Sequence, residues 1–139
     1  MEVWTMNDRP VFDQPFELWR EDGVLYLVLG VGAQVRIHDI KEFIRLVAAL
    51  DGTGFSPVLI EYASGASVAE EARMLLRRVC GAQGHPVGIL AIDPDGRAQA
   101  EVFKVVERPA FPFRVFARRD EALRWVRERR QLATLVMRS

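Results

Sequence analysis

Two consecutive β-strands are predicted by the stretch FELWREDGVLYLVL at positions 16–29. Its first five residues alternate between apolar and polar, as in a strand with one face toward solvent. Glu21-Asp22-Gly23 is typical of a tight turn, and residues 24–29 are apolar without interruption. An uninterrupted apolar strand indicates burial on both faces. The stretch therefore predicts a hairpin whose first strand forms a sheet edge and whose second strand has helices on both faces.

The rest of the chain alternates between helix and strand patterns. Strands are expected at 57–62, 86–93 and 113–117, and helices at 39–50, 67–79, 97–107 and from 120 onward. Parallel strands joined by helices require right-handed crossovers. The element order β-β-α-β-α-β-α-β-α therefore predicts a single-domain, mixed α/β fold with a mainly parallel sheet and helices packed on it.

Two of the helix starts have the spacing of a capping box. Asp39 is followed three residues later by Glu42, and Ser67 is followed by Glu70 in the same way. We expect Asp39 and Ser67 to be the capping residues of their helices.

Helical spacing also predicts which residues face the core. The third helix is expected to bury its stripe Ala98, Val102, Val105 and Val106, and the fourth helix is expected to bury Trp125.

The segments outside the predicted sheet and helices divide the chain into three parts. We expect an N-terminal extension at 1–15, a domain at 16–130 and a C-terminal extension at 131–139. The core looks complete without the apolar residues of the two extensions. We therefore expect these segments to dock on a second subunit, which would make the protein a homodimer.

Composition narrows the class of protein. The 139 residues include 50% hydrophobic and 27% charged residues, and 19 basic residues balance 19 acidic ones. A neutral chain lacks the basic surface of a dedicated nucleic-acid binder. Apolar runs are shorter than the roughly 20 residues that span a bilayer, and residues 1–4 do not resemble the start of a secretion signal. With one cysteine, Cys80, the chain fits a reducing cytoplasm.

No cofactor or metal is expected from the sequence. A metal site usually combines three or four clustered ligands, whereas His38, His85 and Cys80 are far apart in the chain. The glycines do not have the spacing of a phosphate-binding loop.

Candidate functional residues follow the strand at 57–62. Ser64 and Ser67 lie in the loop that leaves the carboxyl end of this strand, where ligands gather in open α/β sheets. No histidine or aspartate in the same loop marks either serine as a nucleophile, so no catalytic residue is expected. Glu61 could pair with Arg73 in the following helix. Asp93 and Asp95 follow the next strand, where their carboxylates are expected to accept turn and helix amides.

Several motifs together resemble the STAS-like domains, which are the sulfate-transporter and anti-sigma-factor-antagonist domains and their lipid-carrier-like relatives. The motifs are the leading hairpin, Ser-Val-Ala-Glu-Glu-Ala-Arg at 67–73, Phe-Arg-Val-Phe at 113–116 and Glu-Ala-Leu-Arg-Trp at 121–125. The ending is especially similar to uncharacterised bacterial STAS-like families. Antagonists in this family carry a phosphorylatable serine, usually after an aspartate, in the loop that corresponds to residues 63–67. Here that loop reads Ala-Ser-Gly-Ala-Ser, without the aspartate.

The resemblance implies a non-catalytic protein-interaction or regulatory module of a bacterial cytoplasm. Its partner would bind around the loop with Ser64 and Ser67, and Glu61 and Arg73 would lie close by. The alternative is a protein of the same fold that binds a small apolar ligand or a lipid in a pocket between the sheet and the helices.

Overall fold

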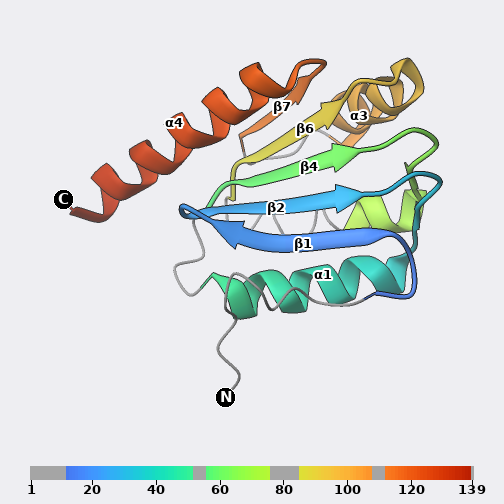
Figure 1. The fold of residues 1–139 in the computed structure, drawn as a ribbon, viewed down its shortest axis with the longest axis horizontal. Helices are drawn as coiled ribbons and strands as arrows, with labels where there is room; N and C mark the ends of the chain where they lie inside the picture. The colour runs from blue at the N-terminus through green and yellow to red at the C-terminus, as the bar shows by residue number, and fades with distance from the viewer. Residues whose placement is uncertain (1–11, 52–55, 76–84, 108–111, 139) are drawn as a thin grey trace.

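The computed structural model describes residues 12–51, 56–75, 85–107 and 112–138. A five-stranded sheet lies at its centre, with the strand order β1-β2-β4-β6-β7 (Figure 1). The strands are β1 (Phe16–Glu21), β2 (Val24–Leu29), β4 (Val58–Tyr62), β6 (Val87–Ala91) and β7 (Phe113–Phe116). β1 pairs antiparallel with β2, and the other neighbours pair parallel. The expected mixed, mainly parallel α/β fold is confirmed.

Helices cover both faces of the sheet. α1 (Ile37–Leu50), a helical segment at 70–75 and α3 (Pro94–Glu107) contribute to one core, and α4 (Arg119–Arg138) packs on the opposite face. After the hairpin, each new strand is added on the same side of the previous one. Right-handed crossovers in a sheet of that order must all lie on one face, which leaves the other face to α4.

The central strands divide their side chains between two cores. Leu25, Leu27 and Leu29 of β2 point to the larger core, under α1 and α3, whereas Val24 points to the smaller core under α4. Trp125 is 7% exposed and packs at the centre of the smaller core, as its helical spacing predicted. A Cβ atom at Gly88 of β6 would lie 3.3 Å from the Trp125 ring, so this glycine leaves room for the indole.

A small second sheet was not anticipated from the sequence. β3 (Gln34–Val35) pairs parallel with β5 (Ser67–Val68), just beyond the carboxyl ends of β2 and β4. The two segments approach each other through turns in which Gly32 (φ 71°) and Gly65 (φ 76°) have left-handed backbone conformations. This pairing joins the loop after β2 to the loop that carries Ser64.

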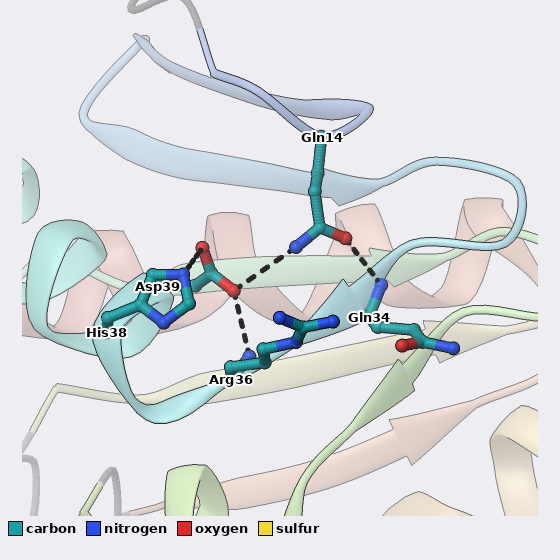
Figure 2. A network of polar contacts seen from close by, with 5 residues as sticks. All are labelled: Gln14, Gln34, Arg36, His38 and Asp39. Atoms are coloured by element: carbon teal, nitrogen blue, oxygen red, sulfur yellow. Dashed lines mark hydrogen bonds and ion pairs between the residues drawn. The ribbon is translucent and has the colours of Figure 1, made fainter.

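The start of α1 differs from its expected position. The helix begins at Ile37, so Asp39 lies in its first turn and accepts the Arg36 backbone N–H at 2.9 Å. Gln14 donates to the same carboxylate at 3.4 Å and accepts the Gln34 backbone N–H at 2.9 Å (Figure 2). Asp39 therefore stabilises the helix start from inside the helix and also ties it to the segment before β1.

The start of α3 lies at Pro94, before the expected residue 97. Proline suits a first helical position because it has no N–H to satisfy there. Asp93 precedes it, and its Oδ1 accepts the Asp95 backbone N–H at 3.0 Å. Asp93 thus caps α3, which agrees with the expectation that it satisfies turn and helix amides.

The buried stripe of α3 was predicted incorrectly. Ala100 and Phe103 are 2% and 4% exposed, whereas Val102 and Val105 are 50% and 68% exposed. The Val106 side chain lies outside the described residues. Both stripes have helical spacing. The stripe that packs against the sheet is the one with Phe103, whose ring centroid lies 5.1 Å from that of Phe113 in β7.

Candidate functional site

An open hollow of about 330 Å³ lies at the carboxyl ends of β4 and β6. Its lining residues come from the ends of these strands, the loops that follow them and the start of α4: Glu61, Tyr62, Ala63, Ser64, Ile92, Asp93 and Arg119. Parallel strands end at a common edge of the sheet, which brings these sequence-distant segments together.

Ser64 lies in the turn after β4, and its side chain is exposed. Its carbonyl accepts the Gly32 backbone N–H at 2.9 Å, and its hydroxyl donates to Asp93 Oδ2 at 3.4 Å. Asp93 therefore holds the Ser64 hydroxyl with one oxygen and caps α3 with the other. The hydroxyl is positioned at the surface by backbone and side-chain contacts together.

Glu61 pairs with Arg119, and the expected pairing with Arg73 is wrong. Glu61 Oε1 lies 2.6 Å from Arg119 Nη2, at side-chain exposures of 22% and 59%. Neighbouring residues of a strand point to opposite faces, and Glu61 points toward the α4 face. Arg73 belongs to the helical segment on the other face, so the sheet separates it from Glu61.

Arg73 has a different set of neighbours. Its Nη1 donates to the Val68 carbonyl at 3.0 Å, and it lines an interior space with Tyr62. Burial raises the pKa of the Tyr62 hydroxyl to about 12, and the nearby Arg73 charge acts in the opposite direction. Arg73 thus stabilises the fold beneath β5, away from the Ser64 hollow.

Ser67 is not a helix cap. It belongs to β5, where its backbone N–H donates to the Ala33 carbonyl at 2.9 Å. The helix that follows begins at 70, and the Ala69 carbonyl accepts the first helical N–H, from Arg73. The β3–β5 pairing replaces the cap expected from the Ser-x-x-Glu spacing.

Two exposed aliphatic side chains flank the Ser64 turn. Val31, in the loop after β2, is 75% exposed, and Ile92, after β6, is 62% exposed. β4 lies between β2 and β6, and Ser64 contacts the neighbouring residues Gly32 and Asp93. We call Val31, Ser64 and Ile92, with Asp93 and Arg119, the Ser64 surface.

The two histidines of the chain have separate partners. His85 Nδ1 lies 2.9 Å from the Ser56 carbonyl oxygen, and the exposed His38 lies 3.3 Å from Asp39. Within the described ranges, no group of three His, Cys, Asp or Glu side chains could hold a metal ion. Cys80 lies outside those ranges.

The interior space next to Tyr62 bears on the lipid-binding alternative. It lies between the sheet and the described parts of α1, α3 and the 70–75 segment, and its volume is about 30 Å³. A space of that size holds about two water molecules. Among the described residues, this space is far smaller than a lipid chain.

Sequence reasoning identified Glu61, Ser64 and Asp93 but missed Arg119, Val31 and Ile92. Each missed residue lies within a few positions of the carboxyl end of a strand, which is the signal that could have found them. Their exposure and proximity to Ser64 depend on strand order, which the sequence pattern does not specify.

The architecture is that of a SpoIIAA-like α/β domain. The chain is similar to the crystal structure of an uncharacterised protein of the DUF3478 family, with a SpoIIAA-like fold, from Shewanella loihica PV-4. The TM-score is 0.51 at 18% identity, over 89% of this chain and 99% of the other, so the likeness concerns the fold. Residues 18–130 match DUF7793, a domain of unknown function, and the chain belongs to that family. No curated protein matches it significantly.

None of the helices in the described ranges combines the length and apolar character needed to cross a bilayer.

Proposed function

We propose that the protein is a non-catalytic interaction or regulatory module whose Ser64 surface binds a protein partner. The observation that carries the proposal is the exposed Ser64 hydroxyl, held by Asp93 in a turn whose two neighbouring loops carry the exposed aliphatic residues Val31 and Ile92. Exposed aliphatic residues beside a positioned polar group are typical of a protein contact.

The charged residues of the Ser64 surface fit the same role. Asp93 and Arg119 lie at the edge of the hollow, where Arg119 remains 59% exposed despite its contact with Glu61. Partly exposed charges at the rim of an interface mainly select the partner and speed its association.

A catalytic role for Ser64 has little support in its surroundings. A serine nucleophile is usually activated by an adjacent base such as histidine, and the described contact of the Ser64 hydroxyl is with Asp93. That contact suits a hydroxyl held in place for recognition.

Modification of Ser64 would regulate such a contact. A phosphate would add about two negative charges beside the Asp93 carboxylate, which accepts a hydrogen bond from the unmodified hydroxyl. Because the phosphate replaces the hydroxyl hydrogen, the hydrogen bond to Asp93 is lost. The phosphate and the carboxylate then repel each other, and the charge of the surface changes. The STAS-like resemblance supports a serine switch in this loop, within a bacterial cytoplasm.

The test captures partners with the tagged full-length chain in its native host. We expect wild type to retain a partner in stoichiometric amount and Ile92→Asp and Ser64→Asp to lose it, because both place a charge in the contact. Ser67→Ala is the matched control, since Ser67 is held by backbone pairing outside the hollow. Equal capture by all four proteins would contradict the proposal, as would recovery of a bound lipid with no protein.

A further inference from the structure

α3 has a second apolar face that its own domain does not cover. Ala98, Val102 and Val105 recur at spacings of four and three residues and therefore share one side of the helix. All three are exposed, and the exposed fractions of Val102 and Val105 are 50% and 68%. The opposite side, with Ala100 and Phe103, fills the core.

The solvent face of α1 provides a comparison within the same layer. There the exposed positions include His38, Lys41 and Arg45, as expected for a helix that meets water. Valine is a poorer helix former than lysine, arginine or alanine, because its branched side chain loses rotamer freedom in a helix. Two valines on the outer side of α3 therefore favour a face that is covered in the functional state.

We propose that this face is covered by the α3 helix of a second copy of the chain. The two helices would run antiparallel about a two-fold axis near Val102. In that register Val102 packs against the partner's Val102, and Val105 lies over the partner's Ala98. A large residue then faces a small one twice, as a self-complementary interface requires.

Charge on one flank of the stripe supports the same occupant. Arg97, Glu101 and Lys104 alternate in sign along this flank, and none of them forms an ion pair within the described part of the chain. In an antiparallel pair, equivalent flanks face each other, so Glu101 approaches the partner's Lys104 and Lys104 approaches the partner's Glu101. Both contacts are attractive, whereas an uncharged or singly charged flank would give no such preference.

The other flank of α3 is occupied by the chain itself. Gln99 lies on that side, and its Oε1 accepts the Val68 backbone N–H at 3.4 Å. The apolar stripe and the Arg97–Lys104 flank thus remain available together. This self-association is independent of the Ser64 surface, and either proposal can fail alone.

The first experiment measures the mass of the full chain by sedimentation equilibrium. We expect wild type to reach twice 15.8 kDa at protein concentrations of roughly 100 μM or below. Val105→Asp should weaken the dimer by at least about 100-fold, because it buries charge at both equivalent contacts of the interface. Ile37→Asp is the matched control: it places the same charge on an exposed aliphatic residue of α1, outside both surfaces, and should leave the dimer intact.

A charge exchange tests the register. Glu101→Lys and Lys104→Glu should each weaken the dimer about tenfold, because each places like charges together twice. The double variant restores opposite charges and should return to within a few-fold of wild type. A monomeric wild type, a Val105→Asp dimer of unchanged affinity, or a double variant no tighter than the singles would overturn the proposed pairing.

Discussion

Tyr62 illustrates how one partly buried side chain couples folding to pH. Burial raises the pKa of its hydroxyl from 10.0 to about 12 in the folded protein, while Arg73 partly offsets the shift. The folded state therefore retains the phenolic proton at pH values where the unfolded chain has released it. The stability that this adds is complete below pH 10 and is lost as the pH rises toward 12.

The prediction is that the free energy of unfolding of wild type falls between pH 10 and 12 more steeply than that of Tyr62→Phe. Urea unfolding across this range measures the difference, and ultraviolet absorbance follows the ionisation. Tyr26 titrates in both proteins and serves as an internal reference, since burial also raises its pKa. Parallel pH profiles for the two proteins would contradict the assignment.

Trp125 is the residue on which the smaller core depends most. Its ring packs 5.8 Å from the Phe116 ring and lies against Gly88. We expect Trp125→Ala to lower the free energy of unfolding by about 3–5 kcal/mol through lost burial and a residual cavity. Arg124→Ala, at an exposed neighbouring position, should change it by less than about 0.5 kcal/mol. Chemical denaturation of both variants decides this, and similar midpoints would contradict the packing.

At the scale of elements, the two Ser/Asp-x-x-Glu sequences end up in different environments. Asp39 satisfies the Arg36 N–H at the start of α1, whereas Ser67 forms a backbone-paired strand. The same local pattern therefore stabilises a helix start in one place and does not in the other.

Substitution of the two residues should separate these environments. Asp39→Ala removes an acceptor from the α1 start and should cost about 1 kcal/mol of stability. Ser67→Ala should cost less than about 0.5 kcal/mol, because the backbone hydrogen bonds of β5 remain. Thermal unfolding of both variants provides the comparison, and a larger loss for Ser67→Ala would restore its role as a cap.

At the scale of the whole molecule, α4 is longer than its contact with the sheet. Val126 is fully buried, but no side chain described between Arg127 and Leu132 is buried. The helix continues to Arg138, within the segment expected to be a C-terminal extension.

Deletion of residues 132–139 distinguishes two modes of self-association. If α3 forms the interface, the truncated chain keeps the mass of the dimer, because α3 with its Glu101 and Lys104 is intact. If the C-terminal segment instead docks on a second subunit, its removal should shift the mass toward that of the monomer. Sedimentation equilibrium of the truncated chain beside wild type measures which occurs, and a monomeric product would contradict the α3 interface.

The sequence alone determined the α/β class, the antiparallel β1–β2 start and the burial of Trp125. These features follow from alternation, apolar runs and helical spacing, which depend on near neighbours in the chain. The candidate residues Glu61, Ser64 and Asp93 were also identifiable, since each lies at or just after the end of a predicted strand.

Only the tertiary structure decided which distant residues meet. Strand order places Glu61 next to Arg119, and the packing of α3 buries Phe103 rather than Val102, although both lie on stripes with helical spacing. The β3–β5 pairing likewise overrode the cap pattern at Ser67. The physical reason is that a periodic pattern specifies a face of an element, whereas the partner of that face depends on the arrangement of all the elements together.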